Sequence, residues 1–247
     1  MRKLERPNIS SRMQNYLDKK QKQVDGGNDT NRVWKAARIT KTMQAVARLL
    51  AGMTGIRERC FYCMDSRGTT IEHFRPKARF PEMTFVWENL LSLCSGCNVS
   101  KGDVFPVDEH GNPLLIDPTI EDPWEFLFYD VDTDNIVPRY DVEADGYSRK
   151  GHETLRVFQT IGYQAVEEGR RQTRRDIYEA VEHFLAEAAP IGSPLEDELL
   201  RSVSGHDGYG LAYWFFCRDG ADYPPFCDLR RQFPETWAKL KALASGF

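Results

Sequence analysis

Two pairs of cysteines constrain the fold of this chain more than any other feature. Cys60 and Cys63 form one C-x-x-C pair, Cys94 and Cys97 form another, and 30 residues separate the two pairs. Two residues between thiols let both sulfurs point at one ion, and two such pairs complete a tetrahedral four-sulfur site that favours zinc. A redox pair normally stands alone in a βαβ context, and a disulfide framework requires an oxidising compartment. We therefore predict a structural Zn²⁺ ion held by the four thiolates.

The segment that these pairs enclose carries side chains that suit hydrolytic chemistry. It contains Glu72-His73 and Asn89, and Asn98 follows the last thiol directly. Taken singly, a histidine is most often structural, and an asparagine after a turn is usually a cap. A zinc frame, however, should bring the carboxylate, the imidazole and the two carboxamides close to one another.

Together these residues resemble the HNH nuclease motif in its ββα-metal, treble-clef form. The acidic-His pair is Glu72-His73, the middle Asn is Asn89 before two leucines, and the final position is Asn98, where the family carries either His or Asn. The resemblance implies an α+β fold. Its ββα-metal core, with the four-cysteine zinc site, would be embedded in a mostly helical chain with N- and C-terminal helices.

The chemistry of phosphodiester hydrolysis gives each of these side chains an expected role. Neutral His73 would take the proton of the attacking water, because imidazole has an ordinary pKa of about 6.5. Glu72 and Asn98 would supply oxygen ligands to a catalytic Mg²⁺ or Mn²⁺ ion. Asn89 completes the catalytic set with His73 and Asn98, as a brace for the His73 loop rather than a ligand. The candidate phosphate contacts, each of which is alternatively a solvated surface charge, are Arg75, Lys77 and Lys101.

Flanking segments narrow the resemblance to the PtuB-type HNH proteins of the Septu antiphage system, a type that also accompanies some retrons. The similar segments are residues 72–77, 80–90, 101–106, 114–118 and 121–123, and a later region with Arg170, Arg171 and Arg174. This similarity implies the nuclease subunit of a defence complex that acts on DNA beside an ABC-type ATPase (PtuA-like). The chain itself has no G-x-x-x-x-G-K-[ST] loop.

Two other functions stay open. A stand-alone HNH restriction-type nuclease would need a specificity domain, and we find no recognition-helix signature and no excess of basic residues beyond residue 101. A catalytically inactive, zinc-stabilised nucleic-acid- or protein-binding module would not need Glu72, His73 and Asn98.

Charge and composition set broader limits. The 247 residues are 41% hydrophobic and 28% charged, which is typical of a globular protein. The longest uncharged run, residues 89–100, is too short to span a membrane, and the basic start leads into no apolar core, so we expect a cytoplasmic protein without a membrane partner. Residues 1–101 carry 19 Lys and Arg against 9 Asp and Glu, whereas residues 102–247 carry 14 against 28. The basic half can attract phosphate, although a solvated surface gives the same balance.

Patterning along the chain divides it into four predicted regions. In the first region, residues 1–56, residues 1–29 are a loose polar leader, or an arm that orders on a partner. A basic helix follows over about 31–52, capped by Thr30 or Asn31. Residues 57–103 are the HNH core, and residues 104–150 are an acidic, proline-rich connecting segment of extended pieces packed on that core. Residues 151–247 are a helical region, with a break at Gly162 and a helix to about Ala189. Ser193-Pro194 opens a further helix, and residues 209–217 form a buried aromatic one.

Overall fold

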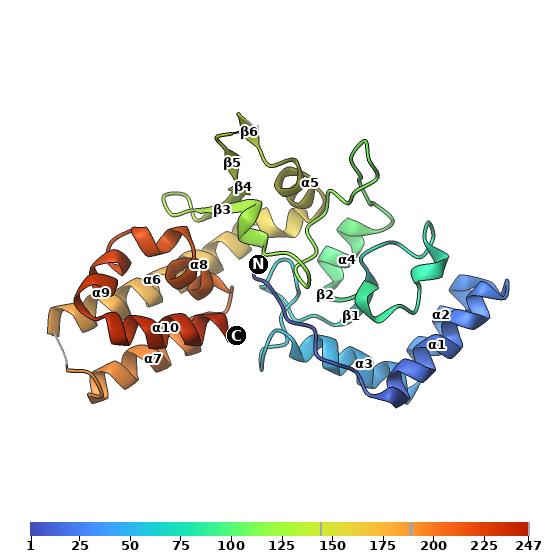
Figure 1. Ribbon diagram of the computed structural model, residues 1–247, viewed down its shortest axis with the longest axis horizontal. Helices are drawn as coiled ribbons and strands as arrows, with labels where there is room; N and C mark the ends of the chain where they lie inside the picture. Colours follow the sequence, from blue (N-terminus) through green and yellow to red (C-terminus); the bar gives the residue numbers. More distant parts are fainter. Residues whose placement is uncertain (144, 188–189, 247) are drawn as a thin grey trace.

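The computed structural model describes residues 1–143, 145–187 and 190–246. Figure 1 shows the N-terminal helices and a small ββα unit on one side of the molecule and the C-terminal helices on the other. The first residues of the chain run between these two parts (Figure 1), and the side chains of Met1 and Leu4 are buried there. None of the helices in the described ranges is long and apolar enough to cross a bilayer.

The ββα unit lies where it was predicted: its two strands lie between the cysteine pairs, and its helix begins at the second pair. Strand β1 (Thr70–His73) pairs antiparallel with β2 (Leu90–Leu93), with His73 opposite Leu90, and helix α4 (Ser95–Lys101) follows directly. All four residues of β2 are buried, which fixes the hairpin in the core. Two short 3-10 helices, η1 (Pro81–Met83) and η2 (Trp87–Asn89), lie in the connection. The predicted fold class, a ββα core within a mostly helical chain, is confirmed.

The prediction that residues 1–29 form a loose leader is wrong. Residues Ser11–Asp25 form helix α1, and the segment before it is fixed by hydrogen bonds to distant backbone. The guanidinium of Arg6 donates to the carbonyl oxygens of residues 87, 88 and 90, at 2.8–3.0 Å. The start of the chain therefore braces the turn that leads into β2.

The basic helix predicted over about 31–52 is two helices, α2 (Thr30–Arg38) and α3 (Lys41–Gly52). Thr40 causes the break, because its side chain accepts a hydrogen bond from a backbone N–H of α3 and so starts a new helix. The cap of α2 is Asp29, rather than Thr30 or Asn31, and its carboxylate accepts from the Arg32 N–H.

The acidic segment consists of short extended pieces, as predicted. After η3 (Pro123–Glu125), β3 (Leu127–Asp130) pairs with β4 (Asn135–Pro138), and β5 (Tyr140–Asp141) pairs with β6 (Gly146–Tyr147). The apolar side chains of Leu115 and Ile116 are buried, although they form no strand.

The C-terminal part is helical. Its elements are α5 (Arg149–Val157), η4 (Gln159–Gly162), α6 (Gln164–Glu187), α7 (Pro194–His206), α8 (Leu211–Cys217), η5 (Asp219–Asp222), α9 (Phe226–Gln232) and α10 (Pro234–Ser245). The break comes earlier than predicted, because α5 ends at Val157 and the separate 3-10 turn η4 is what ends at Gly162. The Ser193 cap is confirmed, and α8 is almost wholly buried. The predicted helix end at Ala189 lies outside the described residues.

Asp134 joins this helical part to the hairpin of β3 and β4. Its buried carboxylate accepts hydrogen bonds from the Tyr129 hydroxyl (2.5 Å), Arg171 Nε (2.9 Å) and Arg174 Nε (2.7 Å). Burial raises the pKa of Asp134, but these hydrogen bonds outweigh it and hold the pKa below its usual value. Arg170 donates to the Asp134 carbonyl oxygen. The arginines of α6 thus fix the helix against the hairpin.

Candidate active site

The four cysteines of the two pairs form one buried cluster. Their sulfur atoms all lie within 4.8 Å of one another, and the Cys63 and Cys94 sulfurs are 3.8 Å apart. A tetrahedral zinc ion with Zn–S bonds of about 2.3 Å places its sulfurs about 3.8 Å apart, so the cluster fits this ion. Cys94 also caps α4, and the backbone N–H of Phe61 donates to the Ser92 carbonyl oxygen, which ties the first pair to β2.

Glu72 and Asn98 face a common cleft next to this cluster. Both line a cavity of about 550 Å³, together with Lys77. Glu72 lies on β1 and Asn98 on α4, one residue beyond the last cysteine, so the zinc frame fixes both elements. Within the described residues the Asn98 side chain has no hydrogen-bond partner. A carboxylate and a free carboxamide on one cleft are a donor set that fits a hard divalent cation such as Mg²⁺ or Mn²⁺.

Lys101 is directed at Glu72 rather than at solvent. Its side chain is fully buried, and its Nζ lies 3.6 Å from Glu72 Oε1. Burial lowers the pKa of Lys101, and the Glu72 charge opposes this shift. Burial likewise raises the pKa of Glu72, and the Lys101 charge opposes that shift. The two groups therefore favour each other's charged form.

The other two candidate phosphate contacts lie differently. Lys77 is half-buried and lines the cleft. The Arg75 guanidinium lies over the rings of Phe80 and Phe105, with its central carbon 5.5 and 5.4 Å from their centroids. Of the three predicted cations, Lys77 is thus the one that lines the cleft itself.

His73 ends β1 in a fixed orientation. Its Nε2 lies 2.9 Å from the carbonyl oxygen of Thr84. Because a carbonyl can only accept, Nε2 carries the proton and Nδ1 keeps its lone pair. The ring is only 2% exposed, and the Trp34 ring packs against it with centroids 4.4 Å apart. Burial lowers the pKa of His73 to about 3, so the imidazole is neutral at physiological pH.

Asn89 connects the two ends of the loop that follows His73. Its Oδ1 accepts from the Arg75 N–H (2.7 Å), and its Nδ2 donates to the carbonyl oxygens of Arg75 (3.0 Å) and Met83 (2.9 Å). The Phe74 N–H donates to the Asn89 carbonyl oxygen. The Asn89 side chain thus hydrogen-bonds to the backbone at both ends of the loop, at Arg75 and at Met83, and it does not line the cleft.

Replacing this side chain should loosen the loop. We expect Asn89→Ala to lower the free energy of unfolding by about 2–3 kcal/mol, because three half-buried backbone groups lose their partner. Urea unfolding of the variant and of Asn15→Ala, at an exposed asparagine of α1, measures the difference. Equal stability of the two variants would contradict the bracing role.

The buried His73 should also make stability depend on pH. Between pH 6.5 and about 3 the unfolded chain binds a proton at this residue and the native chain does not, so native stability falls as the pH falls. We expect wild type to lose about 1.4 kcal/mol per pH unit more than His73→Gln across this window. Unfolding in denaturant at several pH values, without Mg²⁺ or Mn²⁺, measures both slopes. Parallel curves below pH 6 would refute the shift, and parallel curves above pH 7 are expected.

Sequence reasoning did not find one wall of the cleft. Helix α2 contributes Asn31, Trp34, Lys35 and Arg38 to its lining, and α3 contributes Met43, Gln44 and Ala47. The basic face of this region was visible in the sequence, but nothing local indicates that it packs against β1. The carbonyl oxygen of Thr84, which orients His73, was likewise unpredictable.

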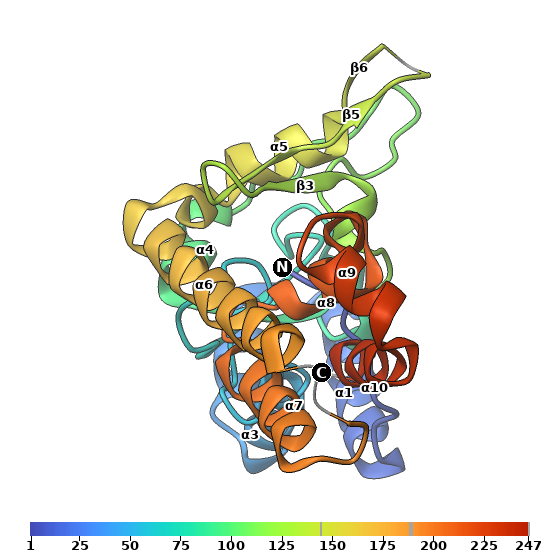
Figure 2. The same ribbon diagram turned by 90° about the vertical axis from the view of Figure 1, so that its left-hand side faces the viewer.

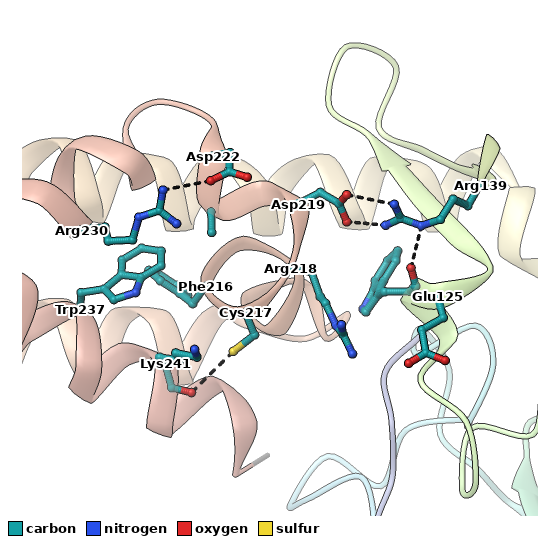
Figure 3. A pocket seen from close by; sticks show the side chains of 12 residues that line it. Glu125, Arg139, Phe216, Cys217, Arg218, Asp219, Asp222, Arg230, Trp237 and Lys241 are labelled. Atoms are coloured by element: carbon teal, nitrogen blue, oxygen red, sulfur yellow. Dashed lines mark hydrogen bonds and ion pairs between the residues drawn. The ribbon is translucent and has the colours of Figure 1, made fainter. Parts of the chain in front are cut away.

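A second cavity, of about 610 Å³, lies in the C-terminal part and offers less chemistry. It is lined by Trp124, Trp237, Lys241 and several ion-paired residues. Figure 3 shows Arg139 paired with Asp219 and Arg230 paired with Asp222 across it. These four charges are paired with one another, and His73, Glu72 and Asn98 are not part of the lining.

Comparison with known proteins agrees with this geometry. Residues 60–104 match the family model described as HNH endonuclease, so the chain contains an HNH endonuclease domain there. Over 126 residues the chain is 32% identical to Septu protein PtuB from Bacillus thuringiensis. The matched segment is 49% of this chain and 43% of PtuB. Over 54 residues the chain is 44% identical to protein ea31 of Escherichia phage lambda. That segment is 21% of this chain and 18% of ea31. The chain thus spans less than half of each relative. The predicted HNH motif and the similarity to PtuB are confirmed.

Proposed function

We propose that this protein is a metal-dependent HNH endonuclease that hydrolyses phosphodiester bonds of DNA. The observation that carries the proposal is the cleft of β1 and α4. There Glu72 and Asn98 present oxygen donors. His73, the next residue along β1, is neutral and oriented by the Thr84 carbonyl oxygen, and its buried ring lies behind the lining of the cleft rather than in it. An inactive binding module would have no use for this combination.

The side chains divide the work of hydrolysis between them. His73 takes the proton of the attacking water at Nδ1, because Nε2 is held by the Thr84 carbonyl oxygen. Glu72 and Asn98 would hold a divalent ion, which would supply positive charge to stabilise the phosphate and the departing 3′ oxygen. The Lys101 ammonium keeps the Glu72 carboxylate ionised and in place.

Asn89 and Lys77 act beside this centre. The three hydrogen bonds of Asn89 hold the loop after His73 and so keep the imidazole at its position. Lys77 lines the cleft and would contact a phosphate of the bound strand. Cleavage of supercoiled plasmid DNA by the purified chain in Mg²⁺ or Mn²⁺ tests the proposed reaction.

We further propose that the chain is the nuclease subunit of an antiphage defence complex with an ABC-type ATPase. Its similarity to Septu protein PtuB supports this role. Nucleotide binding would belong to the ATPase, since no P-loop motif occurs in these 247 residues. Co-expression of the tagged chain with an ABC-type ATPase encoded beside its gene tests the assembly, and failure to co-purify would contradict it.

A further inference from the structure

One face of helix α2 lines the candidate nuclease cleft. Asn31, Trp34, Lys35 and Arg38 are three, four and seven residues apart, the spacing that places side chains on one side of a helix. The same cavity is also lined by Glu72 of β1, Asn98 of α4 and Lys77. The cleft is therefore a groove between an N-terminal helix and the ββα unit, rather than a feature of the ββα unit alone.

Packing of α2 fixes this face in position. The Trp34 ring lies against His73 and, with ring centroids 5.4 Å apart, against Phe85. Val33 and Ala37, on the adjoining side of the helix, are buried as well. The buried side chains of Val33, Trp34 and Ala37 hold α2 in place, so that Lys35 and Arg38 lie at the cleft and are not part of the core.

The two cations on this face have no structural task. Lys35 and Arg38 are exposed, and within the described residues neither side chain has a hydrogen bond or ion pair. Arg139, between β4 and β5, and Arg230 of α9 differ, because each pairs with an aspartate. Unpaired cations beside a phosphodiester-hydrolysing centre match the charge of its substrate.

We propose that α2 is the second wall of the substrate cleft, and that Lys35 and Arg38 bind phosphates of the DNA backbone opposite Lys77. That the ligand is DNA rests on the proposed nuclease function. A strand in this groove is held on both sides, with its phosphate between them facing Glu72 and Asn98. The two side chains are positioning residues, since they hold the strand and take no part in the bond cleavage.

The test is the salt dependence of DNA binding by the full chain. Fluorescence anisotropy with labelled single-stranded and duplex oligonucleotides, without Mg²⁺ or Mn²⁺, compares wild type with the double variant Lys35→Gln, Arg38→Gln. The matched control is Lys19→Gln, Arg32→Gln, which removes the same charge from exposed positions of α1 and α2 that do not line the cleft. Thermal melting verifies that both variants fold.

On whichever DNA form wild type binds more tightly, we expect the cleft variant to lose on the order of tenfold or more in affinity at 0.1 M salt. The slope of log K against log salt should fall by about 1.4–1.8, because two phosphate contacts are lost. In cleavage assays KM should rise with kcat changed less than about threefold. Equal binding by the cleft variant and the control, on both DNA forms, would overturn the inference.

The outcome separates this inference from the proposed function. Wild-type DNA binding that depends on Lys35 and Arg38, without cleavage in Mg²⁺ or Mn²⁺, would support the groove and contradict hydrolysis. Cleavage with unchanged KM in the cleft variant would support hydrolysis and overturn the role of α2.

Discussion

Replacing His73 by alanine should abolish DNA cleavage while leaving the fold intact. A positioned general base contributes about 10²–10⁴-fold to the rate, and no histidine other than the proposed base, His73, lies next to a residue that lines the cleft. We expect the single-turnover rate in Mg²⁺ or Mn²⁺ to fall at least about a hundredfold in His73→Ala. Measurement under single-turnover conditions, in the presence of any required ATPase, isolates the chemical step.

Two controls decide what such a loss means. The variant should keep one zinc ion per chain, because His73 lies outside the four-sulfur cluster. Its affinity for DNA should stay within about threefold of wild type, since the ring is only 2% exposed and its proposed partner is the attacking water rather than the DNA. Loss of zinc together with activity would show that His73 is structural, and an unchanged cleavage rate would exclude it as the base.

The second large effect is expected from the zinc cluster. Cys94→Ser leaves three thiolates and also changes the cap of α4, the helix that carries Asn98. A structural zinc site contributes directly to folding, so we expect loss of bound zinc and a fall in the melting temperature of about 10 °C or more. Zinc content by atomic emission and a thermal unfolding scan measure the two quantities.

Cys227→Ser provides the matched comparison. This cysteine is half-buried in α9 and lies outside the cluster, so its replacement should change neither zinc content nor melting temperature by much. Removing zinc from wild type with a chelator should reproduce the Cys94→Ser melting temperature. A Cys94→Ser protein that retains stoichiometric zinc and wild-type stability would contradict the structural role of the cluster.

The centre of the molecule was predictable because ligand spacing dictates geometry. Two cysteine pairs that must meet at one ion bring the turn at Cys60 and Cys63 against the start of α4, and Asn98 then follows the last sulfur into the cleft. The carboxylate of Glu72 arrives on the paired strand, opposite Leu91. The spacing of the cysteines and the resemblance to HNH nucleases therefore both predicted the ββα unit.

The surroundings were not predictable, because long-range contacts decide them. No pattern in residues 1–9 indicates that Arg6 will bond to backbone around residue 88. The apolar periodicity of residues 33–50 continues across the break at Thr40, which hides the boundary between α2 and α3. Lys101 was predicted as a phosphate contact or, alternatively, a solvated surface charge, and its burial against Glu72 depends on how α4 packs on β1.

The most direct test of the account is the metal dependence of DNA cleavage by wild type and by Glu72→Gln. The account predicts that wild type, with its zinc retained, nicks or linearises supercoiled plasmid in Mg²⁺ or Mn²⁺ and not in buffer free of both. Glu72→Gln, which removes the carboxylate from the cleft, should be inactive at the same metal concentrations while keeping its zinc. Equal cleavage with and without the added metal, or full activity of Glu72→Gln, would contradict the account. So would an inert wild type, with zinc bound and the ATPase present.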